Sequence, residues 1–384
     1  MTAWFWIAAF LGCSGQILDD YEQEKAKVLT PAPAVEGRWQ PDIRLRISYL
    51  SLNEMGKKLL QDSIGKGQVR KEALGVTLSV KLSNSIESFS LSDGGDGGKL
   101  AFGAKAIGTA RWKVGALKSA LPYTASIRGT AELVEKKGTT HLKLVSIDSL
   151  KLGTKNSPTI DIAPAVESWM KEAIEKTAKI ELGHVDLEKF GLRAMRVTSE
   201  EKTAVISLLS DVPDASPLPP AFKEISSDWE LMASEDCVSM WMRRAAYRTG
   251  IISHGVAVDP QSFSMKEQDF VMGLRLWRLE GLGKWWREYE VSGKTEVSKH
   301  KIKMAAEDVA EGEKSPWAGA ANPLILLGEG LIMDALEEQI SYVLPAKRAT
   351  RIGDKRLKAK VEKVYGKQGA VVVQGKLVMV STQQ

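Results

Sequence analysis

Cysteine and histidine are scarce in this chain of 384 residues, and neither residue type occurs at a spacing typical of metal or catalytic sites. Two cysteines, Cys13 and Cys237, cannot form the dense disulfide framework of a small secreted domain. The four histidines are scattered, and no His-Glu-x-x-His motif or second cysteine pair offers zinc ligands. A Gly-x-Ser-x-Gly elbow is lacking as well. We therefore expect no enzyme, no metal site and no cofactor, and interpret Cys237 as a buried, unreactive thiol.

Long hydrophobic runs and a strong net charge are also missing. No stretch of about 18 apolar residues occurs, which argues against a bundle of membrane-spanning helices. The 53 Lys and Arg residues exceed the 48 Asp and Glu residues by only five, so the charge gives no reason to expect a nucleic-acid partner. The share of hydrophobic residues, 43%, is that of a folded protein, and the length suits two domains of ordinary size.

The first residues resemble the secretory signal of a bacterial lipoprotein. The stretch from Trp4 to Leu11 is apolar but too short to span a bilayer, and Gly12 and Cys13 follow where such proteins are cleaved and acylated. This predicts a signal peptide over residues 1–12 and lipid attachment at Cys13, which would anchor the protein in a membrane. The alternatives are a wrongly assigned start codon or a buried N-terminal strand. Residues 13–42, polar and then proline-rich, are predicted to form a tether.

Alternating apolar and polar residues predict strands over much of residues 43–212. The clearest alternation runs from Leu74 to Leu82, and the sequence SDGGDGG at 92–98 predicts a turn. Ser51 and Glu54 have the spacing of a capping box and predict the start of a helix. A second helix is predicted after Pro164. Its apolar face carries Val166, Trp169, Met170, Ala173 and Ile174.

The pattern repeats after a proline-rich linker at residues 213–225. Residues 226–384 again predict a short strand, a helix opened by Ser234, several long strands, a long helix after Pro323 and final strands. Corresponding landmarks keep their distance, since 300 − 141 = 159 between two histidines and 323 − 164 = 159 between two prolines. We interpret residues 43–212 and 226–384 as two similar units joined in tandem.

Helices separated by runs of strands indicate an α+β fold with antiparallel pairing. Only two helices per unit are available to cover a broad alternating sheet. The prediction is therefore two tandem units, each a long helix wrapped by a strongly curved antiparallel sheet, with a second helix. Such a unit encloses an elongated apolar interior.

The tandem order, the unit length and the proline linker resemble the tubular lipid-binding (TULIP) superfamily, the fold of bactericidal/permeability-increasing protein. The resemblance spans about Ile43 to Val380 and rests on architecture. It implies that phospholipid or other acyl chains lie between the long helix and the concave sheet. The implied lining comprises Val166, Met170 and Ile174 in the first unit and Leu327, Leu331 and Leu336 in the second. The alternative is that these residues fill a closed core.

Two features are candidates for contact with a membrane surface. Trp285 and Trp286 follow a glycine-containing segment near an expected hairpin end, where tryptophan suits a bilayer interface; alternatively they fill the interior or a contact between units. A basic cluster includes Arg351, Lys355, Arg356 and Lys358. It suits anionic headgroups, or alternatively protects a strand edge from aggregation.

Taken together, these patterns predict a lipid-binding or lipid-transfer lipoprotein, anchored in a bacterial envelope and facing the periplasm or the cell surface. The alternative is a non-enzymatic structural or interaction lipoprotein with the same fold and a filled core. The sequence identifies no protein partner.

Overall fold

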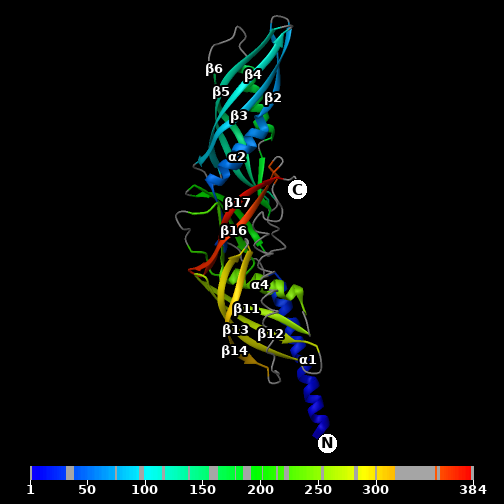
Figure 1. Ribbon diagram of the computed structural model, residues 1–384. Coiled ribbons are helices and arrows are strands. Elements are labelled where there is room, and N and C mark those ends of the chain that lie inside the picture. The colour runs from blue at the N-terminus through cyan, green and yellow to red at the C-terminus, as the bar shows by residue number, and fades with distance from the viewer. Residues whose placement is uncertain are drawn as a thin grey trace.

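Three antiparallel sheets follow one another along the long axis of the molecule in the computed structural model (Figure 1). The six-stranded sheet occupies one end, the seven-stranded sheet the middle and the four-stranded sheet the other end, where the N-terminal helix also lies. The structure describes residues 2–31, 39–73, 76–94, 99–114, 117–136, 139–154, 163–177, 179–184, 192–200, 202–212, 215–219, 225–251, 255–280, 284–298, 301–315, 351–352 and 355–381.

Four helices lie in the described part of the chain. They are α1 (Thr2–Leu29), α2 (Tyr49–Ile64), α3 (Ala163–Thr177) and α4 (Glu235–Thr249). Because the three sheets packed with these helices are antiparallel, the predicted α+β class with antiparallel pairing is confirmed. No helix within these ranges is both long enough and apolar enough to span a bilayer.

The middle sheet is built symmetrically around one central pair of strands. Its order is β15 (Arg351–Ile352), β16 (Lys355–Lys367), β17 (Ala370–Ser381), β10 (Trp229–Ser234), β1 (Ile43–Ser48), β9 (Thr203–Ser210) and β8 (Leu192–Glu200). The central pair, β1 and β10, is antiparallel, with Leu45 opposite Leu231. Each of these two strands leads into a helix and pairs on its outer side with a strand that comes later in the chain.

The two sides of this sheet match residue by residue at one corner. Ser48 pairs with Thr203 and Ser234 pairs with Ala370, so each helix starts beside the beginning of a returning strand. Both returning strands follow tight turns that contain a residue in the left-handed region, with φ of 63° at Lys202 and 53° at Gln368. The symmetry therefore extends to backbone conformation.

The outer sheets consist of longer strands. The six-stranded sheet has the order β2 (Lys66–Ala73), β3 (Val76–Asp93), β4 (Lys99–Val114), β5 (Leu117–Lys136), β6 (Thr139–Thr154) and β7 (Lys179–His184). The four-stranded sheet has the order β11 (Val256–Lys266), β12 (Asp269–Arg278), β13 (Trp285–Ser298) and β14 (Lys301–Lys314). Inward side chains alternate with outward ones, as the sequence pattern predicts.

Two local predictions differ from the structure. The strand expected from Leu74 to Leu82 begins at Val76, because β2 and β3 form a hairpin in which Ala73 pairs with Val76. Helix α2 begins at Tyr49, and its N-cap is Ser48, whose hydroxyl accepts a hydrogen bond from the Ser51 amide. The predicted cap at Ser51 is therefore wrong by three residues. The helix predicted to open at Ser234 is confirmed, since Ser234 caps α4.

The segment expected to be a tether is largely helical and packed. Helix α1 continues to Leu29, well into residues 13–42. Its side chains Ile17, Tyr21 and Val28 are buried in a cluster with Tyr247 and Trp277. The polar composition misled the prediction, because the few apolar residues of this segment lie at helical spacing and bury one face. This part of the chain is therefore docked on the body.

One hydrophobic core runs through all three sheets. It includes residues as distant as Leu100 in the six-stranded sheet, Ile43 in the middle and Val291 in the four-stranded sheet. On the other face of the middle sheet, Arg46 and Glu230 form an ion pair of 3.2 Å with both side chains 1% exposed. Burying such a pair requires additional hydrogen bonds, and Gln374 donates one to Glu230.

Candidate functional site

Helix α3 carries the lining predicted for the first unit. Val166, Met170 and Ile174 are fully buried and belong to the main core. On the exposed side of the helix, Lys176 and Glu172 form an ion pair of 2.5 Å. The predicted apolar face is therefore confirmed as buried, and contact with lipid remains a prediction for these three residues.

The six-stranded sheet curls around its two helices. Helix α3 contacts β2 at one edge of the sheet and β6 near the other edge, and it also contacts α2. A flat sheet of this width would not allow one helix to reach both edges. Close approach to β2 is possible because Gly67 leaves room for the ring of Trp169. The curled sheet therefore packs its apolar face against α2 and α3.

Aromatic rings fill much of the space in this enclosure. Phe89 lies against Gly56, where a side chain would collide with the ring, and Phe102 lies in the same way against Gly129. The two rings stack on each other with centroids 5.7 Å apart. Around these four residues the interior is closely packed, as in an ordinary protein core.

One buried polar cluster interrupts the apolar interior. The Tyr123 hydroxyl donates a hydrogen bond of 2.5 Å to Asn84, whose amide nitrogen donates to the Ile64 carbonyl. Gln61 accepts from the Ile86 amide and donates to the Asn84 carbonyl. Burial raises the pKa of Tyr123 to about 12, so the phenol stays neutral at physiological pH. This cluster fixes the end of α2 to β3 and offers no reactive group.

A recess of about 500 Å³ lies where α2 begins and combines apolar with polar lining. Its apolar lining includes Leu50, Leu91 and Ile225, and its polar lining consists of Ser48, Tyr49, Asn53, Ser92, Asp93, Lys202 and Thr203. Leu91 also belongs to the main core, so the recess reaches the apolar interior from outside. Leu50 beside it is 72% exposed, the most exposed large hydrophobic residue described.

The polar side of the recess is held by Tyr49 and Asp93. The Tyr49 hydroxyl donates to the Asp93 carboxylate, and burial together with this bond raises the pKa of Tyr49 well above its usual value. Asn53 accepts from the Leu91 amide at 2.8 Å. Sequence reasoning missed this recess. The available signal was Leu50, which lies off the face formed by Leu52, Met55 and Leu59.

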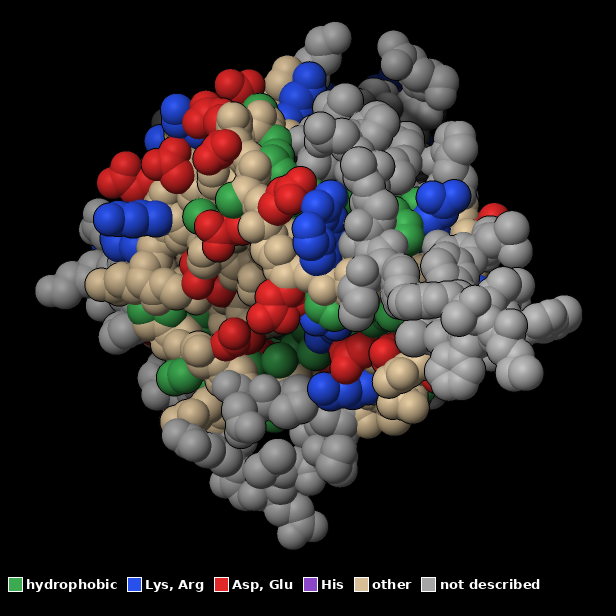
Figure 2. All heavy atoms as spheres, turned by 90° about the horizontal axis from the view of Figure 1, so that it is seen from below, with side chains coloured by type: hydrophobic (Ala, Val, Ile, Leu, Met, Phe, Trp, Pro, Cys, Tyr) green, Lys and Arg blue, Asp and Glu red, His purple; other side chains and the backbone are tan. Residues whose placement is uncertain are grey.

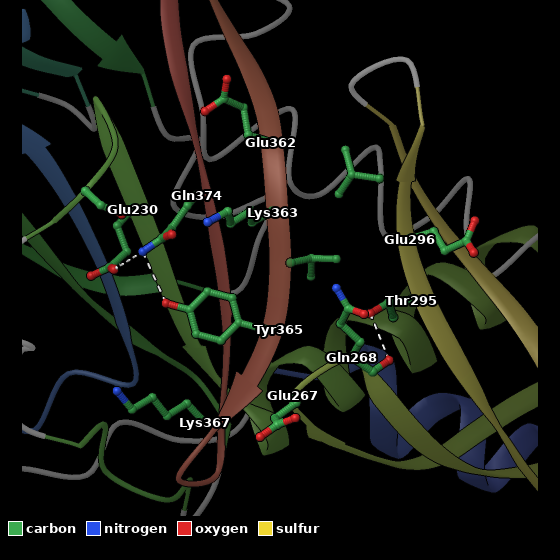
Figure 3. Close-up of a pocket in the computed structure, with 13 residues that line it drawn as sticks. Glu230, Glu267, Gln268, Thr295, Glu296, Glu362, Lys363, Tyr365, Lys367 and Gln374 are labelled. Carbon is green, nitrogen blue, oxygen red and sulfur yellow. Dashed lines mark hydrogen bonds between the residues drawn. The ribbon is translucent and has the colours of Figure 1, made fainter.

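A larger cavity of about 950 Å³ lies between the middle sheet and the four-stranded sheet (Figure 3). Gln374 points toward Glu230 and Tyr365 there, donating to them over 2.8 and 3.1 Å. Three further carboxylates and two lysines line it, namely Glu267, Glu296, Glu362, Lys363 and Lys367. Such a lining suits water or a polar ligand better than an acyl chain. No group of His, Cys, Asp and Glu able to hold a metal ion occurs among the described residues.

A third cavity of about 580 Å³ lies at the free end of the six-stranded sheet, beside Trp112. Lys81, Arg111 and Lys118 contribute to its lining, with no acidic residue among the lining side chains. Trp112 itself is partly buried against the main core. This cavity is therefore cationic and separate from the recess at Leu91.

The residues predicted to contact a membrane differ in how far the structure exposes them. Trp285 is 4% exposed and belongs to the core, as expected of a ring that fills the interior and not of one that meets a membrane. Trp286 is partly buried, with the Arg275 guanidinium 4.6 Å from its ring. Lys358 is exposed on β16. Arg351 and Arg356 pair across the β15–β16 hairpin, and the side chains of Arg351, Lys355 and Arg356 lie outside the description.

The remaining predicted residues cannot be placed at a site. Leu327, Leu331 and Leu336 lie outside the described residues, together with the whole helix expected after Pro323. Cys13 lies in α1, where only its backbone is described. Cys237 is fully buried in α4, and burial raises the pKa of its thiol well above the usual value. The interpretation of Cys237 as a buried and unreactive thiol thus agrees with its surroundings.

Comparison with known proteins yields similarity in structure alone. No protein-family model matches the chain, and no curated protein matches it in sequence. Among solved structures, the chain is similar to P47 of Clostridium botulinum E1, with 10% identity and a TM-score of 0.40 over 88% of this chain and all of the other. P47 from Clostridium botulinum A2 gives 13% and 0.35, covering 88% and 97% of the two chains. A lipopolysaccharide binding protein gives 10% and 0.32, covering 88% and 99%. These values are too low to assign a function.

Proposed function

We propose that this protein binds acyl lipids, with the chains in the apolar interior of the curled six-stranded sheet and the polar headgroup in the recess at its end. The observation that carries this proposal is Leu91, which lines both the recess and the core. An acyl chain entering there passes the exposed Leu50 and meets apolar side chains beyond it. Lys202 and the hydroxyls of Ser48, Ser92 and Thr203 surround the place left for a phosphate or ester group.

The driving force for such binding is the removal of hydrocarbon from water. A chain of roughly sixteen carbons gains on the order of 10 kcal/mol at about 0.8 kcal/mol per CH₂ group, before the costs of ordering are subtracted. No covalent chemistry is needed. A non-enzymatic role as a carrier or sensor of lipid follows from this mechanism.

The finer architecture belongs to the same proposal. We infer two tandem TULIP-like units, supported by the matching corners of the middle sheet at Ser48 and Ser234. We also infer a lipid anchor at Cys13, supported by the apolar stretch and Gly12 before it. These features together suggest a lipoprotein facing the periplasm or the surface of a bacterial envelope, with phospholipid as its ligand.

Uptake of fluorescent phospholipid by the purified protein tests the entry route. Leu50→Glu is expected to lower uptake several-fold, because a charge at the mouth opposes passage of hydrocarbon. The fold should tolerate it within about 0.5 kcal/mol, since Leu50 is mostly exposed. Val145→Glu, at another exposed apolar residue, is the matched control and should leave uptake unchanged. Equal uptake by both variants and the unchanged protein would rule out this entry route.

A second candidate function is that of a scaffold with a filled core, and the rings of Phe89 and Phe102 against glycines favour it. The substitution Met170→Trp separates the two. If the interior opens for lipid, the larger tryptophan side chain blocks lipid uptake at little cost in the free energy of unfolding. If the interior is filled, it overpacks the core and lowers the free energy of unfolding by about 1–3 kcal/mol. Lys171→Trp, on the exposed face of α3, is the control.

A further inference from the structure

Helix α1 is fixed to the four-stranded end of the molecule by contacts along its second half. The Tyr21 ring lies 5.4 Å from that of Tyr247 and 5.7 Å from that of Trp277, measured between centroids. Tyr21 is 2% exposed, and Ile17 one turn earlier is 8% exposed. These contacts place one face of α1 against α4 and the β11–β12 hairpin.

Charged groups add directional contacts to the same interface. Arg243 of α4 donates to Glu24 over 3.2 Å while it is held by Asp259 at 2.7 and 2.9 Å. The neighbouring Arg244 donates to the Val28 carbonyl, and its other nitrogens bind Asp211 at 2.6 and 2.8 Å. Because both arginines are anchored by buried carboxylates, they hold α1 in one orientation.

The docked part of α1 begins close to the predicted acylation site. Cys13 precedes Ile17 by four residues of the same helix, which corresponds to a rise of about 6 Å. A lipid on Cys13 would therefore be joined to the body by one helical turn, with no flexible spacer between them. The direction of α1 then sets the direction in which the body stands on the membrane.

The N-terminal end of α1 projects from the molecule beyond the four-stranded sheet (Figure 1). Seen along this direction, the described side chains include acidic and basic groups interspersed over the surface, with hydrophobic groups only in small areas (Figure 2). The described side chains of this face form no broad apolar patch. The free end of the six-stranded sheet lies at the opposite end of the molecule.

We propose that the N-terminal anchor holds the four-stranded end of the protein at a lipid bilayer and directs the six-stranded sheet away from it. This inference rests on the proposed lipid anchor at Cys13. Strand β5 alone has 20 residues and an extended length of about 65 Å, and the middle and four-stranded sheets lie between it and the anchored end, so the free end of the six-stranded sheet lies far from the anchored membrane. In this orientation the recess at the start of α2, which borders the middle sheet, lies between the anchored end and the free end of the molecule.

Energy transfer from single labels to acceptor lipids tests the orientation. The acylated full-length protein is bound to vesicles of phosphatidylcholine and phosphatidylglycerol that contain a rhodamine lipid. A donor is attached at Arg278→Cys near the anchored end or at Lys118→Cys at the free end, both exposed residues. We expect transfer from position 278 to exceed that from position 118 at least fivefold. Equal transfer with the protein bound would overturn the orientation and leave the lipid anchor intact. Failure of the acylated protein to bind vesicles would overturn both.

Releasing α1 provides the second test. Tyr21→Ala removes the ring contacts of the helix, and the transfer ratio should fall at least twofold as α1 loosens from the body. Glu22→Ala, on the exposed side of the same helix, is the control and should keep the ratio. Trypsin cleavage after Lys25 reports whether the helix has been released. An unchanged ratio in a released variant would also overturn the proposal.

Discussion

At the scale of single residues, buried charged side chains are the groups that most need a partner in this structure. The pair formed by Arg46 and Glu230 joins the two central strands of the middle sheet, and Gln374 and Tyr365 extend it toward the cavity. Ion pairs of this kind contribute little net stability compared with apolar substitutes, but removal of one partner leaves an uncompensated charge. The free-energy cost of burying these charges is therefore measured when one partner of the pair is removed.

Replacement of Glu230 by Ala tests this reasoning. Arg46 would remain buried without its partner, and the free energy of unfolding is expected to fall by roughly 3–5 kcal/mol. Urea denaturation followed by tryptophan fluorescence measures the change. Glu362→Ala removes the partner of Lys376 in an exposed pair and serves as control, with an expected change within about 1 kcal/mol. A similar small change in both variants would contradict the assigned role of the buried pair.

Asp42 gives a prediction for pH dependence. Burial raises its pKa, and two hydrogen bonds from Ser210 offset this only in part. Because the folded pKa lies above the unfolded one, the contribution of Asp42 to stability is greatest at low pH and is lost as pH rises through the folded pKa. The stability of Asp42→Asn relative to the unchanged protein should therefore increase between about pH 3 and pH 7. Urea titrations across this range measure it, and a difference that falls with pH would contradict the direction.

At the scale of elements, a strand–helix corner occurs in each half of the described chain, the first half running from β1 to β9 and the second from β10 to β17. Ser48 caps α2 and Ser234 caps α4, each accepting a bond from the amide three residues later. Each corner is also tied to the returning strand of its own half. The matching construction implies that the two caps contribute similarly to stability.

Substitution of each cap by alanine tests this equivalence. Ser48→Ala and Ser234→Ala should each lower the free energy of unfolding by about 0.5–2 kcal/mol, because an amide at the helix start loses its acceptor. Midpoints of urea unfolding for the two variants provide the comparison. Ser63→Ala, near the end of α2, is a control outside the cap. A loss confined to one corner would mean that only one of the helices depends on its cap.

Much of the element order was predictable because period-two alternation identifies half-buried strands reliably in this chain. The alternating residues from Val76 to Leu82 in β3 and the apolar face of α3 followed directly from spacing. Pairing across the halves was not predictable, since nothing local to β1 specifies β10 as its neighbour. The recess at Leu50 was missed because a single exposed leucine carries little information in a sequence. Helix α1 was missed because its docking partners lie more than 200 residues away.

At the scale of the whole molecule, the shared middle sheet couples the two halves. Strands β1 and β10 pair directly, and a single apolar core continues through all three sheets. Neither half can complete its own part of this sheet without exposing a strand edge. The two halves therefore fold as one unit. The recess beside Leu50 and the docked helix α1 lie at different positions along its long axis.

Unfolding of the whole protein is therefore expected to be a single transition. Circular dichroism and tryptophan fluorescence should report the same midpoint in urea, because loss of one half exposes the β1–β10 edge of the other. The variant Leu45→Ala, at the central pair, should lower the free energy of unfolding by about 2–5 kcal/mol and move the midpoints of both signals together. Two separate transitions would show that the halves are independent domains.

Native mass spectrometry of protein purified without detergent shows whether this protein holds acyl lipid in its interior without covalent chemistry. We expect masses above that of the acylated chain, with increments that correspond to whole phospholipids and that disappear after extraction with organic solvent. A mass equal to that of the chain and its anchor alone, together with no uptake of added labelled phospholipid, would contradict it.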